Sequence, residues 1–170
     1  MGGGIGGIAQ IGVVCGSSKA WGATTGTGNG SYGTKFVGTL GQEIGHQFGG
    51  GHTWNFCGDA TGRNGNTAFE PGSGSTIMSY GGSCDTNNVQ GYKDLYFHSG
   101  SIEEIRYYVD NGNVSQCGSF TPTDNLEPTV TLSYPSFFNI PIGTPFELNG
   151  SATDPDGDAL TYCWARRRPA

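Results

Sequence analysis

Charged side chains are scarce in this 170-residue sequence, and basic ones are the scarcer kind. Asp, Glu, Lys and Arg make up 13% of the residues, and eight basic against fourteen acidic side chains leave a formal net charge of −6. A surface of this sign repels phosphate groups, so neither a nucleic acid nor an anionic membrane is expected as a partner. Arg166, Arg167 and Arg168 form a short basic tail, and three arginines alone do not indicate nucleic-acid binding.

Long apolar runs are also missing. No stretch approaches the roughly 20 apolar residues that a membrane helix needs, so no membrane span is predicted. The opening Met-Gly-Gly-Gly has neither the charged start nor the apolar centre of a signal peptide. Five cysteines nevertheless favour an oxidising compartment. We therefore expect a secreted or cell-surface protein whose secretion signal lies upstream of this sequence.

Histidine is rare as well, and two of the three histidines lie in one short motif. Residues 42–52 read Gln-Glu-Ile-Gly-His-Gln-Phe-Gly-Gly-Gly-His. Side chains four residues apart share one face of a helix, so Gln42 and His46 are predicted to project toward the same point. Gly49 can adopt the left-handed conformation that ends a helix, and the turn would bring His52 back to that point.

This motif resembles the signature H-E-x-x-H-x-x-G-x-x-H of the metzincin zinc endopeptidases at every fixed position except the first, where Gln42 replaces histidine. The resemblance implies one Zn²⁺ held by Gln42, His46 and His52, with an open position for water. It also implies that Glu43, beside the ligand face, acts as the general base. Gly49 would be the structural residue that turns the chain after the helix.

A second element, Ser75 to Tyr80, resembles the Met-turn that lies beneath the metal in the same clan. Met78 is the only methionine besides the first residue, and the resemblance gives it a structural role below the zinc. Tyr80 stands where several branches of the clan have a tyrosine that helps to stabilise the transition state. Glu43 and Tyr80 are therefore the predicted catalytic residues, whereas His98 is expected on the surface or packed near a second helix.

Further segments resemble one group within the clan, the secreted bacterial members of the reprolysin-like (adamalysin-type) proteases. These segments are residues 6–15, 67–80, 96–98 and 101–105. The implied fold is α+β, a metzincin-like catalytic domain with an active-site helix, a Met-turn and a C-terminal helix. Because such a domain usually begins with two strands and a long helix, we expect this sequence to be N-terminally truncated and poorly stable by itself.

The strands expected before the active-site helix can be placed from apolar runs and turn residues. An apolar strand is predicted from Ile8 to Cys15, and the substrate-binding edge strand from Trp21 to Thr27. A turn-rich loop is predicted from Gly28 to Gly33.

Two helices are predicted from periodicity and capping residues. Apolar residues at helical spacing predict the packed face of the active-site helix; they are Phe36, Val37, Leu40, Ile44 and Phe48. A second helix is predicted from Ser101 to Asn111, with Ser101 as its N-cap, Glu104 completing a capping box, and Gly112 after its end.

The cysteines suggest disulfide bonds in the protease-like region. Four of them, Cys15, Cys57, Cys84 and Cys117, allow three pairings. The resemblance to reprolysin-like proteases implies that Cys15 pairs with Cys117 and that Cys57 pairs with Cys84, which leaves Cys163 over. Free buried thiols are the alternative.

Composition divides the sequence into three segments. Residues 1–120 form the partial metallopeptidase domain, residues 121–128 form a linker rich in Pro, Asp and Asn, and residues 129–170 form the start of a β module. The last segment resembles the first half of an immunoglobulin-like or cadherin-like β-sandwich, with strands at Thr129–Leu132 and Phe146–Leu148. Such a sandwich needs about 100 residues, so the module would be partial.

An acidic turn in the last segment has candidate cation ligands. Asp154, Asp156 and Asp158 lie in Asp-Pro-Asp-Gly-Asp, and carboxylates suit Ca²⁺. A solvated acidic turn without calcium is the alternative.

Gln42 leaves two functions open. A neutral amide binds zinc more weakly than an imidazole, so the residue represents a lost site, a weak but real site, or a sequence error, since one base separates the codons. The first function is a zinc-dependent endopeptidase, weakened by Gln42, that hydrolyses protein or peptide substrates through a metal-activated water. The second is a catalytically inactive pseudoprotease that serves as a peptide-binding or surface-attached module.

Overall fold

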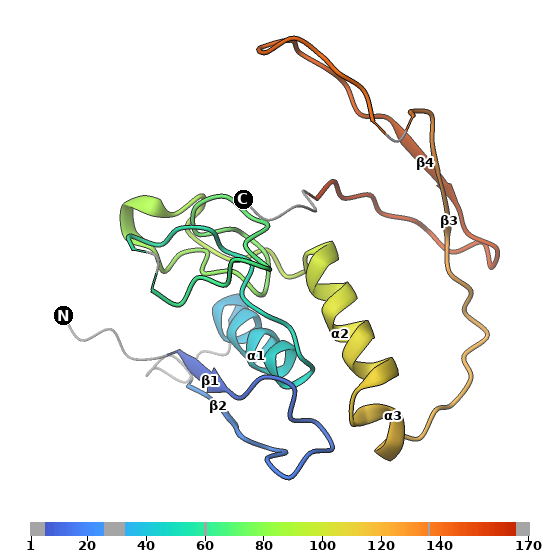
Figure 1. Cartoon of the computed structure of the whole chain (residues 1–170). Helices are drawn as coiled ribbons and strands as arrows, with labels where there is room; N and C mark the ends of the chain where they lie inside the picture. The colour runs from blue at the N-terminus through green and yellow to red at the C-terminus, as the bar shows by residue number, and fades with distance from the viewer. Residues whose placement is uncertain (1–5, 26–32, 60, 136, 166–170) are drawn as a thin grey trace. The chain divides into compact units, whose positions relative to one another are not determined.

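The structure, a computed structural model, describes residues 6–25, 33–59, 61–135 and 137–165 (Figure 1). The chain divides into two compact units, one made of Met1–Ser119 with Ala165–Ala170 and the other of Phe120–Trp164. The predicted loop before Gly33, the last two residues of the predicted edge strand and the arginine tail lie outside the described residues. None of the described helices is long and apolar enough to cross a membrane.

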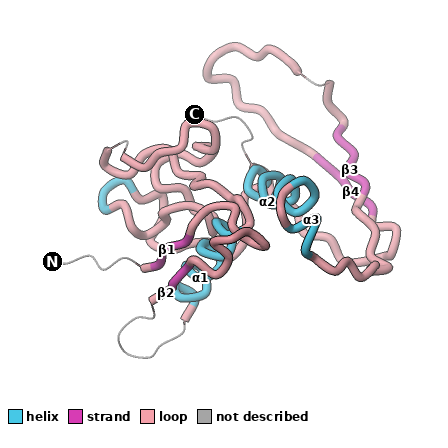
Figure 2. The backbone as a smooth tube through the Cα atoms, turned by 60° about the horizontal axis from the view of Figure 1, so that its bottom comes forward, coloured by secondary structure: helices cyan, strands magenta, loops and turns pink. Residues whose placement is uncertain are grey.

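The first unit combines helices with a small sheet, as expected for an α+β metallopeptidase-like domain. Its elements in chain order are β1 (Gly7–Ala9), β2 (Gly22–Thr24), α1 (Thr34–Gln47), a short 3₁₀ turn (Asp85–Asn87), α2 (Ser99–Asn111) and α3 (Val114–Cys117). Strands β1 and β2 pair antiparallel, with Ile8 opposite Ala23, and α1 packs against both strands (Figures 1 and 2).

Both strands of this sheet are shorter than predicted. The strand expected from Ile8 to Cys15 ends at Ala9, because Gly12 adopts φ 65° and turns the chain toward the end of α1. There the amides of Gly12 and Val13 donate to the carbonyls of His46 and Gln47 at 2.8 and 3.0 Å. The backbone after β1 therefore bonds to carbonyls at the end of α1 instead of extending the sheet.

The helix α1 forms where the motif predicts it, but it buries a different face. Val37, Leu40 and Ile44 of the predicted apolar stripe are 49, 38 and 46% exposed, so the prediction that they pack in a core is wrong. The buried positions are instead glycines and polar side chains; they are Gly38, Gln42, Glu43, Gly45 and His46. Because the glycines have no side chains, side chains from other loops can approach this face closely. This face of α1 is therefore the one that is buried.

Gly49 ends α1 in the way the spacing predicts. It adopts φ 90°, and its amide donates to the His46 carbonyl at 2.9 Å. The Gly50 amide then bonds the Gly45 carbonyl at 2.8 Å, which is the long bond of a Schellman-type helix end. From α2, the Tyr108 ring packs beside Gly49, and its hydroxyl donates to the Val14 carbonyl at 2.9 Å.

The start of α2 differs from the predicted capping box. The N-cap is His98, whose Nδ1 accepts from the Gly100 amide at 3.0 Å, and the helix begins at Ser99. Ser101 lies inside the helix, fully buried, and Glu104 accepts from the Gly51 amide at 3.1 Å. Glu104 therefore holds the loop after α1, where the sequence had suggested only a local helix cap.

The loops between α1 and α2 are organised around one buried carboxylate. Glu70 accepts from the Ser75 and Thr76 amides at 2.8 and 3.0 Å, from the Thr76 hydroxyl at 2.6 Å, and from the Thr53 hydroxyl. Fully buried Ser73 and Ser79 lie nearby in the same loops. Hydrogen bonds from backbone amides and hydroxyl groups to this carboxylate thus hold the two loops together.

Two disulfides cross-link this unit. Cys57 is bonded to Cys84, with Cα atoms 4.8 Å apart, and Cys15 to Cys117, with Cα atoms 6.0 Å apart. These are the two pairings that the family resemblance implies, and the longer one closes 102 residues of sequence. Cys163 is a free, exposed thiol.

The second unit contains one antiparallel strand pair. Strand β3 (Thr129–Leu132) pairs with β4 (Gly150–Thr153), with Val130 opposite Ala152. The strand predicted at Phe146–Leu148 is a loop, and the pairing partner begins two residues later. None of the described residues between 120 and 164 is buried, so this unit has two strands but no core of its own.

Candidate metal centre

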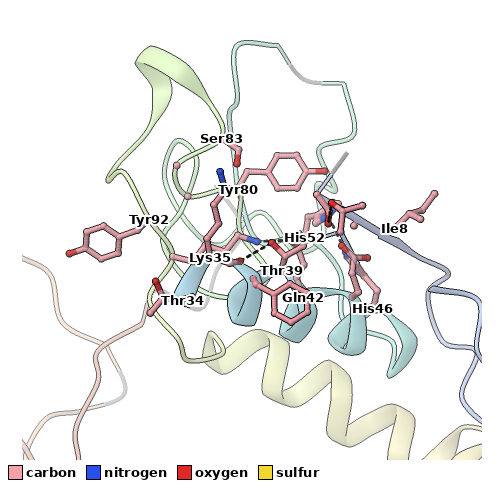
Figure 3. Close-up of a pocket in the computed structure, with 18 of the residues that line it drawn as sticks. Ile8, Thr34, Lys35, Thr39, Gln42, His46, His52, Tyr80, Ser83 and Tyr92 are labelled. Carbon is pink, nitrogen blue, oxygen red and sulfur yellow. Dashed lines mark hydrogen bonds between the residues drawn. The ribbon is translucent and has the colours of Figure 1, made fainter. Parts of the chain in front are cut away.

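A cleft of about 1000 Å³ lies along the buried face of α1. Its walls come from α1, from β1 and from the loops around Tyr80 and Lys93, and all five predicted metal-binding and catalytic residues line it. These five are Gln42, Glu43, His46, His52 and Tyr80. Figure 3 labels four of them, Gln42, His46, His52 and Tyr80.

The strand that borders this cleft is β1. Gly7, Ile8 and Ala9 all line it, whereas Thr25, directly after β2, is the nearest contribution from the second strand. The sequence had placed the substrate-binding edge at Trp21–Thr27, whereas the strand that lines the cleft is β1. Strand β1 also approaches Glu43, because a Cβ built on Gly7 would lie 2.5 Å from the Glu43 Oε1.

His46 and His52 converge on one point. Their Nε2 atoms are 3.1 Å apart, and the two rings meet edge to face at 84°. The Nδ1 of His46 bonds the Gly50 carbonyl at 2.8 Å, which fixes the ring and directs Nε2 into the cleft. Two ligand nitrogens on one tetrahedral zinc are separated by about 3.3 Å, given Zn–N distances near 2.0–2.1 Å. This histidine pair therefore fits a zinc ion.

Both imidazoles are held neutral by their surroundings. Burial lowers the pKa of His46, partly offset by its hydrogen bond to Gly50. Burial, together with the charges of His46 and Lys93, lowers the pKa of His52 to about 4. Neutral imidazole is the form that binds a metal, so the nitrogens are in the right state at neutral pH.

The third predicted ligand, Gln42, is already occupied. Its Oε1 accepts a hydrogen bond from the Nζ of Lys93, which also donates to the Ile77 carbonyl at 3.1 Å. Burial lowers the pKa of Lys93 to about 8, while Glu43 and Glu70 act to raise it. Sequence reasoning missed Lys93, because a lysine in a loop is usually solvated and nothing around Tyr92-Lys93-Asp94 distinguishes it from that case.

Glu43 and Tyr80 face the same cleft as the histidines. Burial raises the pKa of the Glu43 carboxyl, and the Lys93 ammonium opposes that shift. The Glu43 carboxylate lies so close to β1 that a Cβ at Gly7 would be 2.5 Å from its Oε1. Burial and the charge of Glu43 raise the pKa of Tyr80, which keeps its hydroxyl protonated.

Tyr80 is fixed by aromatic neighbours. Its ring meets that of His52 at 4.7 Å and stacks on Trp54 at 5.2 Å. Trp54 is 1% exposed, and this buried ring packs against the rings of both His52 and Tyr80. His98, in contrast, stacks on Phe69 and caps α2, and it does not line the cleft.

Met78 is completely buried directly behind α1. A Cβ at Gly45 would lie 2.5 Å from its Sδ, and its carbonyl accepts from the Thr53 amide at 3.1 Å. Met78 thus contacts the helix between Gln42 and His46 and, through Thr53, holds the residue after His52.

The donor set for a metal is incomplete in the described part of the chain. No group of three or more His, Cys, Asp or Glu side chains placed to hold a metal ion occurs there. The cleft offers two histidines and an amide that is bonded to an ammonium group. Two of the three positions therefore fit zinc, and the Gln42 position does not fit as it stands.

The acidic turn of the second unit gives no support to the calcium prediction. Asp154 Oδ1 accepts from the amides of Asp156 and Asp158 at 2.8 and 3.2 Å, and Asp156 accepts from the Leu126 amide. The Asp154 carboxylate therefore caps the turn, as Asp side chains commonly do, and Asp156 holds the distant Leu126 amide. They are not among any three-residue metal group of the described residues.

The comparison with known protein families agrees with the motif. Residues 2–107 match the model of "Metallo-peptidase family M12B Reprolysin-like". No curated protein and no solved structure matches the chain. Since the family model covers well over half of the 170 residues, the chain belongs to the reprolysin-like metallopeptidase family M12B.

Proposed function

We propose that this protein is a zinc-dependent endopeptidase whose affinity for zinc is lowered by Gln42. The observation that carries the proposal is the 3.1 Å approach of the His46 and His52 Nε2 atoms, inside a cleft that Glu43 and Tyr80 also line. A helix and a following loop that served only packing would have no need to gather two neutral imidazoles, from His46 and His52, and the Glu43 carboxylate around one cleft.

Each residue has a role that its environment supports. Zinc held by His46 and His52, and by Gln42 once its oxygen leaves the Lys93 ammonium, would supply Lewis-acid polarisation of water and of the scissile carbonyl. Glu43 takes the proton from the attacking water and passes it to the leaving amine, a task that its raised pKa favours. The Tyr80 hydroxyl, kept protonated, donates to the oxygen on which negative charge develops.

The peptide substrate would bind along β1. Gly7, Ile8 and Ala9 of this strand line the cleft, and an extended peptide can add to a strand edge by backbone hydrogen bonds. In this arrangement the scissile bond lies between the β1 edge and the histidine pair.

A second candidate function is a pseudoprotease that binds peptides without cleaving them. The Lys93 ammonium on Gln42 favours it, because a cation already stands at the first ligand position. The β1 edge and the cleft would then serve binding alone, and zinc would be absent at physiological concentrations.

We also propose where the protein acts, to which group of the family it belongs and how its sequence divides into segments. The two disulfides support secretion, and residues 67–80 support the secreted bacterial group by resemblance. We assign residues 1–120 to the peptidase, 121–128 to a linker and 129–170 to a partial immunoglobulin-like or cadherin-like module. The antiparallel pair β3–β4 supports the last assignment.

The test is zinc content together with proteolysis. Zinc per chain is measured by mass spectrometry after equilibration at low micromolar free zinc, for the protein and for Gln42→His. We expect substoichiometric zinc in the protein, about one zinc in Gln42→His, and casein cleavage that follows zinc content.

A matched pair of variants assigns the general base. In the Gln42→His background, Glu43→Gln is expected to lower kcat/KM by about 10²–10⁴-fold with zinc content unchanged. The control, Glu103→Gln, replaces an exposed glutamate of α2 and should leave both quantities unchanged. Stoichiometric zinc without any cleavage in Gln42→His would favour the pseudoprotease. Absence of zinc from both proteins would reject the metal site altogether.

A further inference from the structure

Lys93 is the one described side chain that places a positive charge at the predicted first ligand position. Its Nζ bonds the Gln42 amide oxygen and, at 3.1 Å, the Ile77 carbonyl. Ile77 directly precedes Met78, so Lys93 joins α1 to the loop behind the metal centre. Both acceptors lie inside the unit that carries the histidine pair.

The charge of Lys93 reaches the whole site. It acts on the imidazoles of His46 and His52 and on the Glu43 carboxyl. Glu43 and Glu70 are the carboxylates that act on the lysine in return. Lys93 is thus placed among the same groups that a zinc ion would contact, and it carries charge of the same sign.

A cation at this place opposes metal binding in two ways. An ammonium on Gln42 Oε1 occupies the oxygen that would have to turn to the metal. Two like charges within a few ångströms also repel strongly in a partly buried site, where screening is weaker than in water.

We infer that Lys93 acts as a resident cation that competes with zinc, so that the metal site is weakened by the Lys93 ammonium in addition to the Gln42 amide. The inference rests on the proposed function and goes one step further. Restoring histidine at position 42 removes the amide but leaves the charge, and therefore repairs only part of the site. The alternative is that Lys93 is a buried lysine with satisfied hydrogen bonds and no influence on the metal.

The experiment measures zinc affinity by competition with a chromophoric chelator at pH 7 and moderate ionic strength. Gln42→His is compared with Gln42→His/Lys93→Met, which removes the charge at similar length, and with Gln42→His/Lys93→Arg, which keeps it. Gln42→His/Lys19→Met is the control, since Lys19 is an exposed lysine outside the cleft. Circular dichroism and urea unfolding establish that each variant is folded.

The Lys93→Met double variant is expected to bind zinc at least about tenfold more tightly than Gln42→His. The Lys93→Arg and Lys19→Met double variants should stay within about twofold of Gln42→His, because neither removes a charge from the cleft. Equal zinc affinity in the Met and Arg variants would overturn the inference while leaving the proposed function intact. Absence of zinc from every variant would overturn both.

Discussion

Helix α1 buries polar side chains on one face and exposes apolar side chains on another. Gln42, Glu43 and His46 are each at most 8% exposed, whereas Val37, Leu40 and Ile44 are between 38 and 49% exposed. A surface helix usually shows the reverse, with its apolar stripe toward the core. Burial on this helix therefore follows the chemistry of the cleft and not hydrophobicity.

The difference shows which face of α1 depends on specific contacts with the rest of the fold. The buried polar face is held by specific contacts to Met78, Lys93 and the Gly50 carbonyl, and each polar group there needs its partner. The apolar face makes no comparable demand, but exposed apolar side chains at i, i+3 and i+7 lower solubility. Substitutions on the two faces should therefore differ in size and in kind.

The largest effect is expected from adding a methyl group on the buried face. In Gly45→Ala the new Cβ would lie 2.5 Å from Met78 Sδ and 3.1 Å from Phe97 Cε1. Since Met78 is completely buried, we expect a loss of about 2–3 kcal/mol in the free energy of unfolding, measured with urea.

Gly38→Ala is the matched control for Gly45→Ala. Its Cβ would meet Leu95 Cδ2 at an ordinary 3.5 Å, so the higher helix propensity of alanine should stabilise the protein by about 0.5–1 kcal/mol. Equal effects of the two substitutions would show that Met78 does not constrain this face.

Acid should destabilise the folded protein through His52, which lies in the cleft beside the polar face of α1. Its pKa in the folded protein is about 4, against about 6.5 in an unfolded chain. Between these values the unfolded state binds more protons, so stability is present above about pH 6.5 and is lost as pH falls toward 4, by up to about 3 kcal/mol. Urea unfolding of metal-free protein at pH 7, 5.5 and 4.5 measures the loss.

Removal of the imidazole tests that assignment. His52→Gln cannot take up the proton, so its free energy of unfolding should change less between pH 7 and 4.5. An identical decline in the variant would mean that other groups cause the acid sensitivity.

The smallest effect is expected on the exposed apolar face. Leu40→Gln and Ile44→Gln should change the free energy of unfolding by no more than about 0.5 kcal/mol, and should raise solubility in ammonium sulfate precipitation. Buried Ile77 is the contrast, because Ile77→Val removes one methyl group and should still cost about 0.5–1.5 kcal/mol. A larger loss for Ile44→Gln than for Ile77→Val would show that the exposed face is packed in solution.

The sequence predicted those parts of the site that depend on local spacing. The i, i+4 relation of residues 42 and 46 and the turn at Gly49 require only helix geometry, and the structure has both. It could not predict contacts made across long stretches of chain. Lys93 reaches Gln42 from 51 residues away, and Glu104 reaches Gly51 from 53, which no local pattern encodes.

The errors of the sequence-based fold have a related cause. Periodicity detected the apolar stripe of α1 correctly as a pattern, but a pattern does not say which face tertiary contacts will cover. The N-cap of α2 was misplaced because His98 can accept a hydrogen bond as Ser101 could. The sequence also did not predict that β1, and not the segment Trp21–Thr27, provides the strand that lines the cleft, because that depends on how the strands pack around α1.

Glu70 links the loop that follows His52 to the loop that precedes Tyr80, so the two should unfold together. One carboxylate holds Thr53, the residue after His52, and Ser75 and Thr76, which precede Met78 and Tyr80. Opening either loop would leave this buried anion without its donors, so the two loops should open and close together as one cooperative unit. His52 and Tyr80 then share a single folding equilibrium, so the cleft between them is either assembled whole or not at all.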